Sequence, residues 1–168
     1  ADGTAEPLRA ATDWAAFFAQ PELLIDRGNG GGLAPFPTAA CGVIIAGPEC
    51  PDLAGAVDLA DALGWPLLAD AASGLRGRMI PDTVLRVCAY DAICRAEAAG
   101  TALRPTEVVI FGEVPTSKPL RAWLAATDPL ITQVTSRAAN RDGTHGRTVS
   151  VGAISPRPGG ETPPLPAD

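Results

Sequence analysis

The stretch Glu107-Val-Val-Ile-Phe-Gly-Glu-Val-Pro-Thr-Ser-Lys118 predicts a buried strand, a tight loop and the beginning of a helix. The β-branched and aromatic run 108–111 ends at Gly112, which is typical of a strand followed by a turn. Thr116 or Ser117 is suited to cap the helix that follows. The apolar face of that helix is predicted from the spacing of Leu120, Trp123 and Leu124.

Lys118 falls in the first turn of this predicted helix. In a parallel sheet, that turn lies at the carboxyl end of the strand, where free N–H groups and the helix dipole favour an anion. A lysine at this place opposes the dipole, so it gains nothing from helix stability. The position therefore indicates a ligand-binding lysine, with a solvated lysine after an ordinary cap as the alternative.

Composition indicates one domain with an aliphatic core. The chain has 168 residues, of which 46% are hydrophobic and only 5% aromatic. A net charge of -6 without a basic run argues against nucleic-acid binding. No apolar run approaches the ~20 residues of a membrane span, and no signal peptide is recognisable, so we expect a soluble, cytoplasmic protein. Because Met79 is the only methionine, we also expect a processed start or a piece of a longer protein.

The cysteines and the histidine do not form a familiar catalytic or metal motif. No C-x-x-C pair is present, and the pattern favours small buried thiols in a reducing compartment over a disulfide. The only histidine, His145, lies in a glycine-rich loop without a G-x-S-x-G elbow elsewhere. The four cysteines are Cys41, Cys50, Cys88 and Cys94.

Apolar strands alternate with helices along most of the chain. This order predicts an α/β, Rossmann-like three-layer domain with a parallel sheet of about five or six strands. We expect residues 1–40 to be an N-terminal segment and linker, 41–154 the Rossmann-like domain, and 155–168 a proline-rich linker. The predicted strands are 42–46, 66–70, 107–112, 130–134 and 148–154; the helices run from Asp52 to Gly64, over 83–99 and over 117–126.

Ligands of such a fold meet the loops after the strands. The dinucleotide fingerprint G-x-G-x-x-G is missing after the first strand, and Pro48 and Pro51 remove two N–H groups that a pyrophosphate would use. NAD or FAD binding in the usual mode is therefore not expected. Instead, Arg76, Lys118 and Arg137 are placed so that they could converge on a carboxylate, although a residue of this kind taken alone is more often an ordinary surface residue.

Several blocks occur in an order that resembles one family. They are Leu63-Gly-Trp-Pro-Leu-Leu-Ala-Asp70, Ser73-Gly-Leu-Arg76, Tyr90-Asp91, Phe111-Gly-Glu-Val-Pro-Thr-Ser-Lys118 and Asp142-x-x-His145. From about Cys41 to Ile154 the chain is similar to the middle domain of the MenD family, the 2-succinyl-5-enolpyruvyl-6-hydroxy-3-cyclohexene-1-carboxylate synthases of menaquinone biosynthesis.

The resemblance implies a reaction for the whole enzyme. With thiamine diphosphate and magnesium, it decarboxylates 2-oxoglutarate and adds the succinyl-semialdehyde unit to isochorismate. The cofactor lies between the other two domains, and the enzyme is expected to be a homo-oligomer. This chain lacks the G-D-G…N motif, so no catalytic, cofactor-binding or metal-binding residue is expected here, and the fragment alone is expected to be inactive.

The resemblance implies that the loop before the predicted helix binds substrate. Lys118, with Thr116 and Ser117, would bind a substrate carboxylate, and Pro119 stands where some members have a second basic residue. Arg76 would bind a substrate or a regulatory acid, or else form a salt bridge with Asp70. Two other interpretations remain: an FAD- or ADP-binding middle domain of another thiamine enzyme, and a free-standing Rossmann-like binding module.

Overall fold

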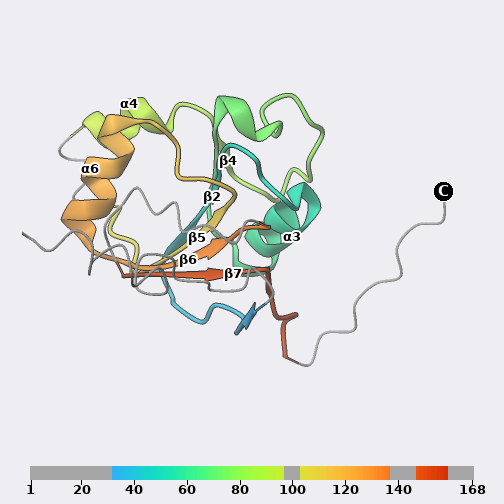
Figure 1. Ribbon diagram of the computed structural model, residues 1–168. Helices are drawn as coiled ribbons and strands as arrows, with labels where there is room; N and C mark the ends of the chain where they lie inside the picture. Colours follow the sequence, from blue (N-terminus) through green and yellow to red (C-terminus); the bar gives the residue numbers. More distant parts are fainter. Residues whose placement is uncertain (1–31, 97–102, 137–146, 159–168) are drawn as a thin grey trace, which may run out of the picture.

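A six-stranded parallel sheet forms the centre of the molecule (Figure 1). The computed structural model describes residues 32–96, 103–136 and 147–158. Every pair of neighbouring strands in this sheet is parallel, in the order β4-β3-β2-β5-β6-β7. The prediction of a parallel sheet of five or six strands is confirmed. The strands are β2 (Gly42–Ala46), β3 (Leu67–Ala69), β4 (Arg86–Val87), β5 (Glu107–Phe111), β6 (Leu130–Val134) and β7 (Arg147–Val151).

Helices cover both faces of the sheet, as a three-layer domain requires. Alternate residues of β2 point to opposite faces, so Ile44 joins one apolar cluster while Val43 and Ile45 join the other. The first cluster lies against α3 (Leu53–Leu63). The second lies against α4 (Tyr90–Arg95) and α6 (Lys118–Thr127). The continuous apolar runs seen in the sequence are explained by this burial on both faces.

The ends of α3 are those that the sequence predicts. The Asp52 carboxylate accepts a hydrogen bond of 2.8 Å from the Gly55 N–H and caps the helix. Gly64 ends it in the left-handed conformation, with φ of 64°.

The predicted helix over 83–99 is wrong in its first half. Arg86–Val87 forms the edge strand β4, which pairs with Leu67 and Leu68, and α4 begins only at Tyr90. The Arg86 guanidinium also donates hydrogen bonds of 2.8 and 2.6 Å to the carbonyls of Leu75 and Arg78. These tertiary contacts favour an extended backbone where local propensity favours a helix.

The predicted strand 148–154 is divided at Gly152. Its first part is β7, whereas β8 (Ala153–Ile154) pairs with β1 (Leu33–Ala34) in a separate two-stranded sheet. The N–H of Gly152, between β7 and β8, donates to the carbonyl of Gly32, just before β1, at 2.8 Å. This bond links the end of the large sheet to the small one. A short strand thus precedes residue 41, and the domain boundaries at 41 and 154 stay predictions.

Some predicted features lie outside the described residues. They are most of the glycine-rich run 28–32, Arg137, and the Asp142 to His145 element. Within the described ranges, no helix is both long and apolar enough to span a membrane.

Candidate functional site

The loop between β5 and α6 is held by backbone contacts with the loop after β2. The Glu113 N–H donates to the Pro48 carbonyl at 2.8 Å. Gly112 has φ of 89°, and a Cβ on it would lie 2.2 Å from the Pro48 oxygen. Only glycine fits this position without moving the backbone, because both the conformation and the space exclude a side chain. The loop that leads to Lys118 therefore has a defined course.

Two long polar side chains bind carbonyl groups of the same loop. Gln133 of β6 donates to the Gly112 carbonyl at 2.8 Å, and Arg121 of α6 donates to the Pro115 carbonyl at 2.9 Å. Gln133 is only 2% exposed, and its Oε1 has no hydrogen-bond partner among the described residues. Neither residue was expected from the sequence to hold this loop, although a glutamine inside a predicted buried strand is a signal of such a role.

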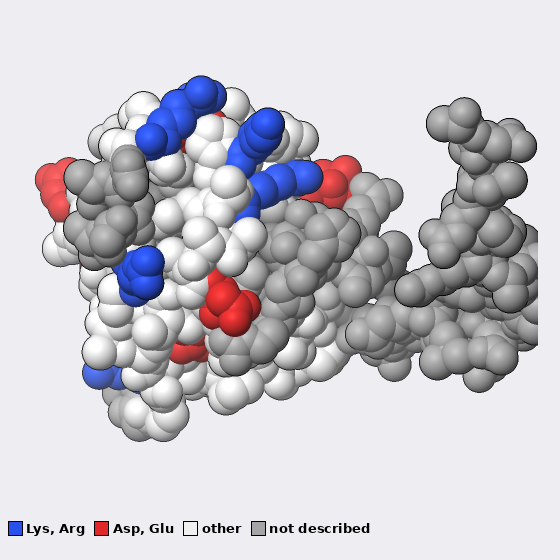
Figure 2. Space-filling model, turned by 90° about the vertical axis from the view of Figure 1, so that its left-hand side faces the viewer, with Lys and Arg blue, Asp and Glu red and all other residues white. Residues whose placement is uncertain are grey.

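The first turn of α6 is the part of the predicted site with the most open polar groups. Ser117 caps the helix by accepting the Leu120 N–H at 3.2 Å, and Lys118 is its first residue, with an exposed side chain. Within the described ranges, no group accepts a hydrogen bond from the N–H of Thr116 or Lys118. Figure 2 shows basic side chains gathered at the top of the face that carries α6.

Arg76 contacts the backbone instead of a carboxylate. Its Nε donates to the Ala69 carbonyl and its Nη2 to the Cys88 carbonyl, both at 3.1 Å. These bonds join the end of β3 to the residues before α4. The salt bridge to Asp70 that the sequence offered as an alternative does not form, and Asp70 instead accepts hydrogen bonds from the Ala72 N–H and the Tyr90 hydroxyl.

The beginning of α4 links the loops of this edge. The Tyr90 hydroxyl donates to Asp70 Oδ2 at 2.6 Å, and the Ser117 hydroxyl donates to Asp91 Oδ1 at 2.5 Å. Burial, the hydrogen bond to Asp70 and the negative charge of Asp70 raise the pKa of Tyr90. The hydrogen bond from Ser117 and that from Arg95 lower the pKa of Asp91. The sequence contained these residues in a motif but did not indicate what they bind.

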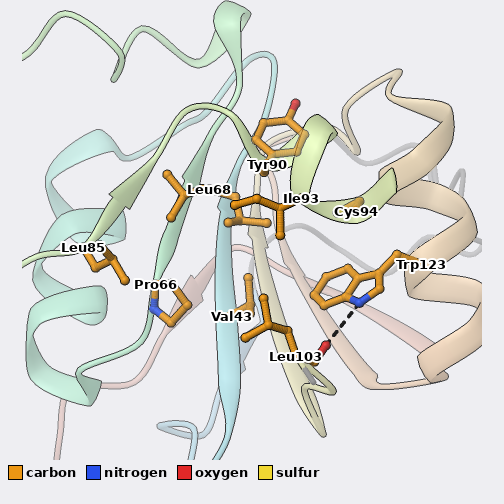
Figure 3. A pocket seen from close by; sticks show the side chains of 10 residues that line it. Val43, Pro66, Leu68, Leu85, Tyr90, Ile93, Cys94, Leu103 and Trp123 are labelled. Atoms are coloured by element: carbon orange, nitrogen blue, oxygen red, sulfur yellow. Dashed lines mark hydrogen bonds between the residues drawn. The ribbon is translucent and has the colours of Figure 1, made fainter. Parts of the chain in front are cut away.

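An apolar cavity of about 200 Å³ lies below α4, over β2 and β3 (Figure 3). Val43, Leu68, Ile93 and Trp123 are among its lining residues. The polar atoms of its two aromatic residues are bound to protein: Trp123 Nε1 donates to the Leu103 carbonyl at 3.1 Å, and the Tyr90 hydroxyl binds Asp70. No polar surface lines the cavity, so it does not suit a carboxylate or phosphate.

The cysteines are free, as the sequence favours, but they are less buried than predicted. Cys41 is exposed, and the other three are partly buried. Cys41 lies in a bend immediately before β2, where its Sγ reaches the Arg104 carbonyl at 3.6 Å. A short apolar pattern does not distinguish the edge of a buried strand from its interior.

The described residues do not fit thiamine diphosphate or its magnesium ion. Among them, no three His, Cys, Asp or Glu side chains gather as metal ligands. The cavity below α4 is apolar, whereas a diphosphate needs donors and a metal ion needs oxygen ligands. At the carboxyl edge, the N–H groups of Thr116 and Lys118 and the exposed Lys118 side chain have the chemistry that suits an anion.

No family model matches the chain, but its similar proteins share one name. It is 40% identical over 121 residues to the 2-succinyl-5-enolpyruvyl-6-hydroxy-3-cyclohexene-1-carboxylate synthase of Thermosynechococcus vestitus, a match that covers 69% of this chain and 20% of the relative. The synthase of the same name from Acaryochloris marina is 36% identical over 115 residues, which are 66% of this chain and 20% of the relative.

A third relative of the same name, from Listeria welshimeri, is 48% identical over 68 residues, which are 40% of this chain and 12% of the relative. The chain thus spans about one fifth of the length of the first two relatives. These identities agree with the resemblance seen in the sequence. The chain belongs, as a segment, to the family of 2-succinyl-5-enolpyruvyl-6-hydroxy-3-cyclohexene-1-carboxylate synthases.

Proposed function

We propose that this chain is the middle domain of a thiamine-diphosphate-dependent synthase of menaquinone biosynthesis. The full-length enzyme would decarboxylate 2-oxoglutarate and add the succinyl-semialdehyde unit to isochorismate, in the cytoplasm and as a homo-oligomer. The observation that carries the proposal is the 40% identity over 121 residues to a synthase of this name. Within the domain boundaries 41–154, the chain would act as scaffold and substrate-facing surface without catalysing the reaction alone.

Thiamine diphosphate and magnesium would be held by the N- and C-terminal domains of the full-length protein. The bound cofactor would supply the stabilised carbanion that joins the two acids. The residues described here would contribute binding and orientation at the carboxyl edge of the sheet. The N–H groups of Thr116 and Lys118 at the beginning of α6, from which no described group accepts a hydrogen bond, support this role in substrate binding.

Lys118 is the residue that we assign to a substrate carboxylate. Its ammonium group would pair with the carboxylate, while the N–H groups of Thr116 and Lys118 would donate to the same anion. Ser117 and Arg76 would complete this surface by shaping its loops. Pro119, the second residue of α6, has no N–H and is compatible with this helix start.

The test begins with the full-length enzyme and its dependence on thiamine diphosphate, magnesium and 2-oxoglutarate for isochorismate consumption. Loss of activity when any one is omitted is expected. Lys118→Ala is then expected to raise the apparent KM of one acid about tenfold, which corresponds to one lost charge-assisted hydrogen bond. Arg104→Ala is the matched control, because Arg104 is exposed near Cys41, at the opposite edge of the sheet. An unchanged KM for both acids in Lys118→Ala would contradict the assignment.

A further inference from the structure

Two consecutive residues at the beginning of α4 bind two different loops. Tyr90 points towards the loop after β3 and binds Asp70, whereas Asp91 binds Ser117 at the beginning of α6. Asp70 and Ser117 both follow strands of the parallel sheet, at its carboxyl edge. The first turn of α4 therefore connects the two loops that the sequence analysis assigned to ligand binding.

Both oxygens of the Asp91 carboxylate are engaged. Oδ1 accepts the Ser117 hydroxyl, and Oδ2 accepts Arg95 Nε at 2.9 Å. The ion pair is exposed and joins residues one helical turn apart, so it contributes little stability by itself. It does offset the negative charge of Asp91, which lies beside a helix start where we propose that an anion binds.

The Ser117 hydroxyl both donates and accepts a hydrogen bond. It has a single hydrogen, which is donated to Asp91, and its oxygen accepts the Leu120 N–H at 3.2 Å. With this hydrogen occupied, Ser117 has no donor left for a substrate carboxylate. Its role is therefore to shape the helix start, and the donors left for an anion are the backbone N–H groups and Lys118.

We propose that Asp91 of α4 is a positioning residue. By orienting the Ser117 hydroxyl, it fixes the conformation of the first turn of α6. The hydrogen bond makes the cap oxygen face the N–H of Leu120 and keeps the main chain of residues 116–118 in one conformation. An effect of Asp91 on substrate binding rests on the proposed function, in which this turn binds a carboxylate. Its effect on the conformation of residues 116–118 does not depend on that function.

Two substitutions of Asp91 separate geometry from charge. Asp91→Asn keeps an oxygen that accepts the Ser117 hydroxyl but removes the negative charge. Asp91→Ala removes both the oxygen and the charge. Arg95→Gln is the matched control, because it breaks the ion pair and leaves the bond between Asp91 and Ser117.

Hydrogen–deuterium exchange of the full-length enzyme measures the effect on the main chain. In Asp91→Ala we expect exchange of a peptide covering residues 112–120 to accelerate roughly fivefold, the effect of losing a helix cap. Asp91→Asn and Arg95→Gln should exchange like the wild type. A peptide covering α3, on the other face of the sheet, should not change in any variant. Should Asp91→Ala not fold, Ser117→Ala and Ser117→Thr provide the same comparison from the other partner.

Kinetics then separate this inference from the proposed function. If the first turn of α6 binds a carboxylate, Asp91→Ala should raise the KM of one acid with little change in kcat, and Asp91→Asn should restore it. Faster exchange with an unchanged KM for both acids would support Asp91 as a positioning residue and contradict the carboxylate site. Two results would overturn the inference whatever the kinetics. One is a folded Asp91→Ala variant whose residues 112–120 exchange at the wild-type rate. The other is an acceleration in Asp91→Asn as large as that in Asp91→Ala.

Discussion

The hydroxyl of Tyr90 donates a hydrogen bond of 2.6 Å to the carboxylate of Asp70, and this bond joins the beginning of α4 to the end of β3. Tyr90 is only 4% exposed and packs in the apolar cluster beneath α4 and α6. Its hydroxyl is thus held at the boundary between that cluster and the carboxyl edge. Asp70 has a second role there, since its other oxygen accepts the Ala72 N–H at 2.8 Å.

The alkaline stability of the chain should depend on Tyr90. Its pKa is raised in the folded protein above the ordinary value of 10.0, so only the unfolded chain ionises just above pH 10. A raised pKa contributes stability that is fully present below pH 10 and is lost as the pH rises towards the folded value. We expect the free energy of unfolding to fall above pH 10 and this fall to be weaker in Tyr90→Phe.

Tyrosinate absorbance checks this directly, because the chain contains one tyrosine. The signal should appear together with unfolding, as followed by circular dichroism. Tyrosinate that forms at the ordinary pKa in a chain that is still folded would contradict the expectation.

Gly112→Ala should destabilise the protein by at least about 1–3 kcal/mol, since it places a Cβ at a left-handed backbone position. The added atom would also lie 2.2 Å from the Pro48 carbonyl oxygen, so the backbone of two loops must move. Gly77→Ala is the control, because a Cβ there meets no atom within 4 Å and the φ of Gly77 is not in the left-handed range. Urea denaturation of both variants measures the difference, and equal stabilities would show that the loop adapts.

Acid should weaken the hydrogen bond between Asp91 of α4 and Ser117 at the beginning of α6. The pKa of Asp91 is lowered by its hydrogen bonds with Ser117 and Arg95. A lowered pKa contributes stability that is present above the unfolded value of 3.8 and is lost as the pH falls through the folded value. We expect the free energy of unfolding of Asp91→Asn to fall less than that of the wild type between neutral pH and a pH below 3.8. Denaturation curves at neutral pH and below pH 3.8 test this, and identical losses would argue against it.

The cysteines should react in a fixed order. Cys41 is exposed, whereas burial raises the pKa of Cys50 and of Cys94. Because the thiolate is the reactive form, iodoacetamide at neutral pH should label Cys41 first. Peptide mass spectrometry identifies the labelled residue, and Cys41→Ser should remove the fast phase. Labelling of Cys94 ahead of Cys41 in the folded chain would be the opposite result.

Several parts of the molecule could be predicted because their signals are local. The apolar runs at 42–46 and 108–111 became buried parallel strands, since an apolar run without alternation is typical of a strand covered on both faces. Asp52 and Gly64 mark the ends of α3 because capping depends on residues within one turn. For the same reason the sequence predicts a cap at Thr116 or Ser117 and Lys118 in the first turn, and the structure has Ser117 as the cap and Lys118 as the first residue of α6.

Only the tertiary structure decided the features that depend on residues far apart in the chain. Arg86–Val87 pairs with β3 and binds distant carbonyls, so an edge strand replaced the predicted helix. The bonds from Gln133 to Gly112 and from Ser117 to Asp91 join residues 21 and 26 positions apart. Local residue patterns determined which segments are strands and helices and where a helix start faces the ligand edge. The folded arrangement determined which side chains hold that start in place, because long-range hydrogen bonds form only after the strands have been ordered in the sheet.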